Sequence, residues 1–142
     1  MKQVKYISEG VHSLCDLHNV SNDKLNDIDY LESIMIKACK LSGATILNIY
    51  KHKFEPAGVT ILISLSESHA SIHTYVDLDS EDSLGKAMLD FFTCGNSCLP
   101  KTGIKYLIDN LCSEESVVSM KVFKRGLDSG IIDLSKMCEI MC

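Results

Sequence analysis

The chain has 142 residues, 46% of them hydrophobic and 23% charged, which suits one folded domain and argues against a disordered chain. Its formal net charge of −5 argues against a general nucleic-acid-binding protein, since these usually present a basic face. No stretch approaches the ~20 consecutive apolar residues of a membrane span, and the N-terminus lacks the apolar run of a signal peptide. Seven cysteines without an export signal indicate reduced thiols. We expect one domain over residues 1–142, located in the cytoplasm, without a nucleic-acid or membrane partner.

The apolar residues of the first half recur first with strand spacing and then with helix spacing. Weak alternation predicts a strand at 9–18. Apolar side chains at intervals of three and four residues predict one helix at 24–42, with Asn22 and Asp23 as candidate caps and Gly43 at its end. Apolar, β-branched runs predict strands at 44–51, 59–65 and 71–77, with turns at 54–58 and 67–70.

The second half begins with an acidic, loop-like segment at 77–85. A strand at 87–93, a helix at 101–113 opened by Pro100, and a strand at 117–124 follow, whereas the tail from residue 127 receives no assignment. Strands and helices mix without strict alternation, so we expect an α+β fold: a two-layer sandwich with an antiparallel sheet and helices on one face. Three cysteines have apolar neighbours and are expected in the core: Cys15, Cys39 and Cys112.

Three ordered segments carry the chemistry of the chain: HKFEPAGVT at 52–60, SESHASIHTY at 66–75 and DFFTCG at 90–95. Taken alone, Ser68 is an ordinary turn residue and Cys94 an ordinary buried one. Together and in this order, the segments resemble the prokaryotic S-adenosylmethionine decarboxylase proenzymes, which depend on a pyruvoyl group. The resemblance covers about residues 9–126.

The resemblance implies that the protein cleaves its own Glu67–Ser68 bond. The Ser68 hydroxyl attacks the preceding carbonyl to give an ester, and elimination and hydrolysis then leave a pyruvoyl group, the only cofactor expected, at the former Ser68. By the same resemblance, His73 acts as a base in this processing and Thr60 assists through its hydroxyl. The products are the fragments 1–67 and 68–142.

The resemblance also assigns the residues that act on the substrate. The pyruvoyl group takes up electrons as the substrate loses CO2, with Ser68, His73 and Cys94 as the catalytic positions; Cys94 returns a proton to the α-carbon. The resemblance assigns substrate binding to Phe54, Glu67 and Asp77, with Phe54 stacking on the adenine. Relatives of this length form homodimers with active sites at the subunit interface, so we expect a homodimer.

Departures from the family pattern leave the substrate open. Asp77 stands where the family has a glutamate, and the acidic segment 77–85 makes this region longer. S-adenosylmethionine, feeding spermidine synthesis, is the first candidate; an ornithine or arginine decarboxylase is an alternative, because carboxylates bind ammonium and guanidinium groups. A second alternative is an uncleaved homologue that acts as a binding or regulatory subunit. His69 and His73 have a spacing that suits zinc only on a helix, so no metal is expected.

Overall fold

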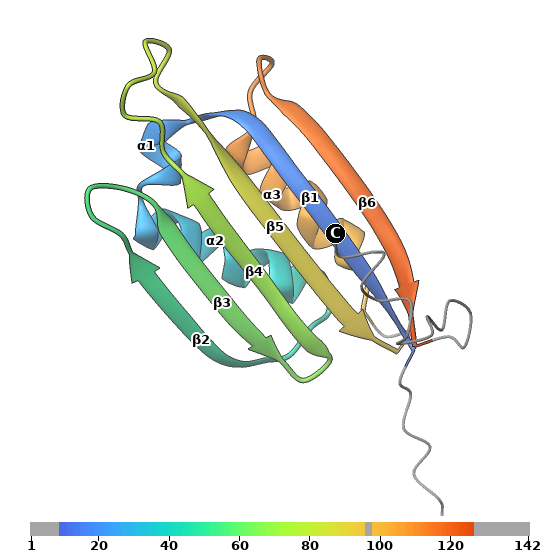
Figure 1. Cartoon of the computed structure of the whole chain (residues 1–142). Helices are drawn as coiled ribbons and strands as arrows, with labels where there is room; N and C mark the ends of the chain where they lie inside the picture. Colours follow the sequence, from blue (N-terminus) through green and yellow to red (C-terminus); the bar gives the residue numbers. More distant parts are fainter. Residues whose placement is uncertain (1–8, 96–97, 127–142) are drawn as a thin grey trace, which may run out of the picture.

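The computed structural model describes residues 9–95 and 98–126, which form one antiparallel sheet with helices packed on one of its faces (Figure 1). The predicted α+β two-layer sandwich is therefore confirmed. The strands are β1 (Gly10–Ser21), β2 (Ile46–Lys53), β3 (Val59–Leu65), β4 (Ser68–Tyr75), β5 (Leu84–Cys94) and β6 (Val117–Arg125), arranged in the order β2-β3-β4-β5-β1-β6. The helices are α1 (Asn22–Leu25), α2 (Ile28–Leu41) and α3 (Pro100–Leu111).

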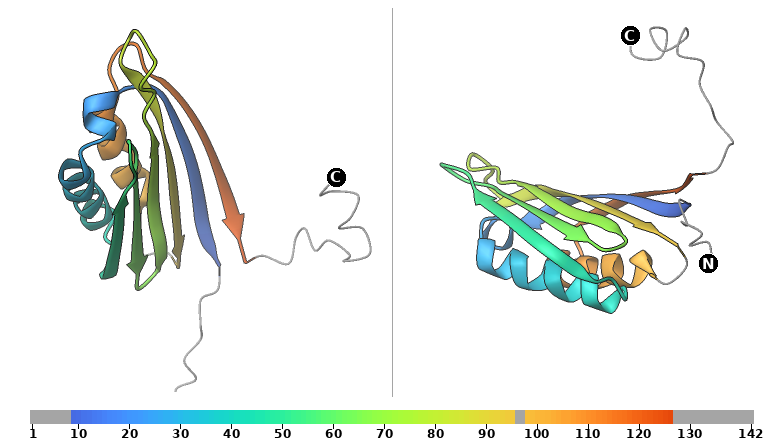
Figure 2. Two further views of the ribbon diagram at one scale, coloured as in Figure 1. Left: turned by 60° about the vertical axis from the view of Figure 1, so that its left-hand side comes forward. Right: turned by 90° about the horizontal axis from the view of Figure 1, so that it is seen from below.

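The core lies between the helices and the sheet, and strands such as β3 and β5 turn alternate side chains into it. In β3 the side chains of Val59, Ile61, Ile63 and Leu65 are buried while those between them are more exposed. Helix α2 buries one stripe against this surface: Leu31, Ile34, Met35, Ala38 and Cys39. The two views in Figure 2 show all helices on one side of the sheet. The opposite face of the sheet is left open.

One predicted helix is two helices in the structure. The helix expected at 24–42 is broken at Asn26 and Asp27, and its expected cap residues Asn22 and Asp23 lie inside the short α1 instead. The break arises because the Asp27 carboxylate accepts a hydrogen bond of 2.9 Å from the backbone N–H of Tyr30 and so starts a new helix. Gly43 follows the end of α2 with φ of 80°, as predicted.

The connection between β3 and β4 is shorter than predicted. Residues 67–70 were expected to form a turn, but only Ser66 and Glu67 lie between the strands. Ser68 already pairs with Leu65 of β3 and with Thr93 of β5, because its segment has neighbours on both sides in the sheet. Ser68 therefore stands at the first position of a central strand.

The other predicted elements are confirmed with shifted ends. Strands β1 and β5 extend further than expected, since they pair along nearly their whole length from Gly10–Cys94 to Ser21–Leu84. Among the described residues, no helix is long and apolar enough to cross a bilayer. The tail 127–142, which received no prediction, lies outside the described residues.

Candidate active site

The peptide between Glu67 and Ser68 lies at the tip of the β3–β4 hairpin, against the end of β5. The backbone N–H of Cys94 donates a hydrogen bond of 2.7 Å to the carbonyl oxygen of Glu67. Ser68 has φ of 138°, a conformation that residues with a side chain rarely adopt and that stores strain. The predicted cleavage point thus combines a hydrogen-bonded carbonyl with a strained serine.

The Glu67 side chain contacts a different segment of the chain. Its two carboxylate oxygens accept the backbone N–H of Thr45 at 3.0 and 3.2 Å. The carboxylate therefore ties the hairpin tip to the segment just before β2. The expected role of Glu67 in substrate binding stays a prediction. In the structure, its carboxylate binds the backbone of Thr45.

A second cluster contains the other predicted processing residues. Thr60 of β3 and His73 of β4 are paired across the two strands, and Thr60 Oγ1 lies 2.9 Å from His73 Nδ1. Both residues line a cavity of about 450 Å³ together with Phe54, the predicted adenine-stacking residue. The remaining lining residues are Ala57, Thr74, Tyr75 and Val76.

The two clusters do not meet within one chain. His73 follows Ser68 by five residues along β4, and at ~3.3–3.4 Å per residue a strand carries them about 17 Å apart. No side chain of ordinary length bridges that distance. The structure thus brings Thr60, His73 and Phe54 together and places Glu67, Ser68 and Cys94 together at the other end of the strand.

Asp77 lies beside the second cluster but contacts other groups. Its backbone is held by Asn22, whose amide nitrogen donates to the Asp77 carbonyl at 2.8 Å. The Asp77 carboxylate accepts the N–H of Asp79 at 3.1 Å. Asp77 lines a separate acidic hollow of about 560 Å³ with Asp23, Asp27 and Asp29. Val76 lines both this hollow and the Phe54 cavity, so the two spaces are neighbours.

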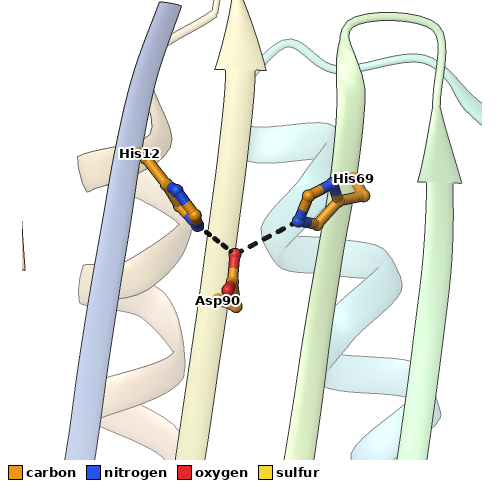
Figure 3. A group of neighbouring side chains, drawn as sticks. All are labelled: His12, His69 and Asp90. Atoms are coloured by element: carbon orange, nitrogen blue, oxygen red, sulfur yellow. Dashed lines mark hydrogen bonds and ion pairs between the residues drawn. The ribbon is translucent and has the colours of Figure 1, made fainter. Parts of the chain in front are cut away.

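Sequence analysis missed a polar network on the open face of the sheet. Figure 3 shows His12 of β1 and His69 of β4 converging on Asp90 of β5. The Asp90 Oδ1 atom lies 2.6 Å from Nε2 of His12 and 3.3 Å from Nε2 of His69. Only the strand register reveals this grouping: His12 and His69 both pair with Phe92, two residues from Asp90.

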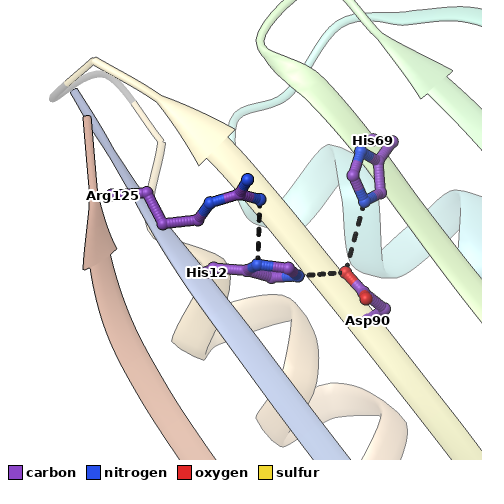
Figure 4. A network of polar contacts seen from close by, with 4 residues as sticks. All are labelled: His12, His69, Asp90 and Arg125. Carbon is purple, nitrogen blue, oxygen red and sulfur yellow. Dashed lines mark hydrogen bonds and ion pairs between the residues drawn. The ribbon is translucent and has the colours of Figure 1, made fainter. Parts of the chain in front are cut away.

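Arg125 decides what this network can do. As Figure 4 shows, its guanidinium reaches His12, with Nη1 3.2 Å from Nδ1. Arginine only donates, so Nδ1 of His12 is the acceptor and its proton sits on Nε2, facing Asp90. The three groups could offer a metal ligand atoms within 4.8 Å of one another. A metal, however, needs that Nε2 lone pair free, so the arrangement fits a hydrogen-bond chain better.

The thiols fall into two classes. Burial raises the pKa of Cys15 to about 11 and that of Cys39 to about 12, so both stay protonated at neutral pH. These two are core residues, as predicted. Burial also raises the pKa of the half-buried Cys112, which packs against the core. Cys94, in contrast, is partly exposed at the end of β5.

Known proteins match this chain along most of its length. The family model described as S-adenosylmethionine decarboxylase matches residues 11–126. The chain belongs to the S-adenosylmethionine decarboxylase family. It is 40% identical over 124 residues to a protein of Brevibacillus brevis named S-adenosylmethionine decarboxylase proenzyme, with 87% of each chain covered.

Further relatives within the family agree. A Synechococcus protein with the same name is 35% identical over 130 residues, covering 92% of this chain and 95% of that protein. The crystal structure of the adenosylmethionine decarboxylase from Aquifex aeolicus superposes with a TM-score of 0.72 at 27% identity, covering 87% of this chain and 96% of that one. The family resemblance inferred from the three segments is therefore confirmed.

Proposed function

We propose that this protein is a self-processing decarboxylase of S-adenosylmethionine, whose pyruvoyl group forms from Ser68. The observation that carries the proposal is the contact between the Cys94 N–H and the Glu67 carbonyl, next to the strained Ser68. An N–H that already points at this oxygen is oriented to stabilise the negative charge that grows there when a nucleophile attacks. The serine at that position is also the residue from which a pyruvoyl group is made, so the residues present fit the group.

The first step consumes no external reagent. The Ser68 oxygen bonds to the Glu67 carbonyl carbon, the carbon–nitrogen bond breaks, and the proton of the hydroxyl is transferred to the released nitrogen. The product is an ester, and release of the strained φ of Ser68 favours it. Elimination from the ester then releases residue 67 as a free carboxylate, and hydrolysis with loss of ammonia leaves the pyruvoyl group on the fragment that begins at residue 68.

Thr60 and His73 reach this reaction from a second copy of the chain. Within one chain they lie about 17 Å from Ser68, whereas a two-fold dimer brings one end of β4 to the other end of the partner's strand. The open sheet face supports such pairing because it exposes large apolar side chains: Leu62, Tyr75, Met88 and Phe123. A depression of about 350 Å³, lined by His73 and Asp90 among others, hollows this face.

The pyruvoyl group, once formed, supplies the electron sink for loss of CO2. The chain's own residues bind the substrate and deliver the proton. The exposed ring of Phe54, at the mouth of the 450 Å³ cavity, offers a face for the adenine. The Cys94 thiol, next to the residue-68 position across the hairpin end, returns a proton to the α-carbon.

A basic amino acid is the second candidate substrate. The observation that favours it is the acidic hollow of about 560 Å³ next to the Phe54 cavity, whose lining includes Asp23, Asp27, Asp29 and Asp77 but only one cationic residue, Lys53. Carboxylates in such a hollow would bind a distal ammonium or guanidinium group. Release of CO2 from S-adenosylmethionine, ornithine and arginine, each labelled in the carboxyl group, separates the two candidates.

Intact mass spectrometry of the purified protein tests self-processing and the dimer together. The wild-type protein should give two fragments that meet between residues 67 and 68, the second lacking a free amino group. Ser68→Ala and His73→Gln chains should each stay whole when expressed alone. Co-expressed with distinct tags, they should yield cleaved His73→Gln chains, because the Ser68→Ala partner supplies an intact His73. A wild-type chain that stays whole would leave only the non-catalytic binding or regulatory subunit.

A further inference from the structure

We propose that His69, held by Asp90, carries the proton from the Ser68 hydroxyl to the Ser68 nitrogen during self-cleavage, acting from the same chain as the serine. The inference rests on the proposed self-processing and adds a residue to it. Within the chain that carries the serine, His73 lies about 17 Å away, so a proton transfer inside that chain needs a nearer group. His69 is its covalent neighbour.

The network leaves one nitrogen of His69 available. An ionised carboxylate only accepts, so the Nε2 atom that faces Asp90 at 3.3 Å carries a proton. The lone pair of His69 then sits on Nδ1, for which the described residues provide no hydrogen-bonding partner. The His69 side chain is 48% exposed, in contrast to the 18% of His12. His69 is thus the member of the network that can exchange a proton with a reacting group.

His12 and Arg125 serve to position Asp90. Arg125 fixes the proton of His12 on Nε2, and this atom then donates to Asp90 at 2.6 Å, the shortest contact of the network. Arg125 is itself held over the Phe92 ring, with its guanidinium carbon 4.5 Å from the ring centre. A carboxylate held from one side by His12 presents a fixed acceptor to His69 on the other.

The fold places the His69 ring against the row of β5 side chains that ends at Cys94. Phe92 and Cys94 follow Asp90 at alternate positions of β5, so the three side chains form one row on the open face. The His69 ring contacts Phe92, with 5.9 Å between ring centres, and Cys94 binds the Glu67 carbonyl. Neighbouring side chains of a strand point to opposite faces only where the backbone is extended. The backbone of Ser68, with φ of 138°, is not extended. Strand alternation therefore does not require the Ser68 hydroxyl to lie on the face of the sheet opposite His69.

The transfer is balanced in protons. Nδ1 of His69 accepts the proton of the Ser68 hydroxyl as the oxygen bonds to the Glu67 carbon. The resulting imidazolium, with Asp90 as its counter-ion, gives a proton to the Ser68 nitrogen as the carbon–nitrogen bond breaks. The ring ends neutral, and the products are the ester and a free amine.

Mixed dimers test the inference with cleavage as the readout. A His69→Gln chain should be cleaved about a hundredfold more slowly than wild type, in keeping with loss of a general acid–base group. Co-expression with the Ser68→Ala chain should not restore its cleavage, although it should restore that of the His73→Gln chain. Asp90→Asn and His12→Gln should slow cleavage less, and His18→Gln, on the same face of β1 but outside the network, should leave it unchanged.

Added imidazole separates a chemical role from a structural one. Added imidazole should accelerate cleavage of a His69→Ala chain. With imidazole present, a folded Asp90→Ala, His69→Ala double variant should still be cleaved much more slowly than the single variant, because no carboxylate holds the imidazole in place. Wild-type rates in His69→Gln, rescue of that variant by the Ser68→Ala partner, or no response of the His69→Ala chain to imidazole would overturn the inference. If the wild-type chain itself stays whole, the proposed self-processing fails instead.

Discussion

The backbone N–H of Cys94 donates a 2.7 Å hydrogen bond to the carbonyl oxygen of Glu67, the carbonyl that precedes Ser68. One residue thereby has two separable parts: its backbone holds the peptide that we propose is cleaved, and its thiol is the group that we propose returns a proton to the substrate. The strand pairing of β4 with β5 fixes this arrangement, since Ser68 is opposite Thr93 in the register. A side-chain substitution at position 94 changes one part and leaves the other.

Replacing Cys94 by alanine should therefore separate processing from turnover. The Cys94→Ala chain keeps the N–H that binds the Glu67 carbonyl, so intact mass spectrometry should still detect cleavage. Turnover should fall by at least about a hundredfold, because the group that returns the proton is lost. Equal CO2 release from the variant and the wild type would remove Cys94 from its assigned role.

Replacement by valine should affect different properties at two threonines on neighbouring strands: stability at one and cleavage at the other. Thr74 is 6% exposed, and its Oγ1 accepts the N–H of Val59 and donates to the carbonyl of Leu25, both at 2.8 Å. Thr74→Val leaves both groups unsatisfied and should lower the free energy of unfolding by about 1–3 kcal/mol. Thr60→Val loses only the contact with His73, so it should slow cleavage and leave stability nearly unchanged. Urea unfolding of the uncleavable Ser68→Ala protein measures the first effect and intact mass the second.

Helix α3 should not tolerate alanine at Gly103. A Cβ atom there would lie 2.5 Å from the carbonyl oxygen of Ala38 in α2, a backbone atom, and 2.3 Å from Ser42 Oγ. Alanine normally favours a helix over glycine by about 1 kcal/mol, but the clash should reverse the sign and cost about 1–3 kcal/mol. Thr102→Ala, on the exposed side of the same helix, is the matched control and should be neutral or slightly stabilising. Thermal unfolding of both variants decides the comparison.

Stability should fall in alkaline solution because of the buried thiols. The pKa of Cys15 rises from 9.0 to about 11 and that of Cys39 from 9.0 to about 12 on folding, through burial. Their contribution is fully present below about pH 9, where the unfolded chain also keeps its protons, and is lost as the pH rises toward 11 and 12. Urea unfolding of the Ser68→Ala protein at pH 8, 9 and 10, with a reducing agent, should show this decline. Cys39→Ala should flatten it; an unchanged slope would contradict the assignment.

The layered fold could be predicted from the sequence, whereas the ends of its helices and strands could not. The spacing of hydrophobic residues predicted each strand and the buried face of α2. Burial of one face imposes a period of two residues on a strand and of close to four on a helix. The same pattern ran across Asn26 and Asp27 without a break, since the cap formed by Asp27 depends on one hydrogen bond to Tyr30. The turn predicted at 67–70 failed for a similar reason: polar residues there pair with strands on both sides.

The candidate site divides in the same way. Its residues Phe54, Thr60, Ser68, His73 and Cys94 came from short segments whose chemistry can be recognised in one dimension. Their separation into two clusters did not, because the distance between Ser68 and His73 follows only once both are known to lie in the one strand β4. The network of His12, His69 and Asp90 was missed altogether.

By itself, the sequence determined the family, the α+β layers and the identity of the reactive groups, since side-chain chemistry and hydrophobic period are local properties. Only the tertiary structure decided which groups meet. Strand register brings residue 12 to residue 90 and residue 94 to residue 67, whereas the length of β4 between Ser68 and His73 keeps those two residues apart. These contacts join positions far apart in the chain, and backbone hydrogen bonding between strands, rather than any local preference, fixes them.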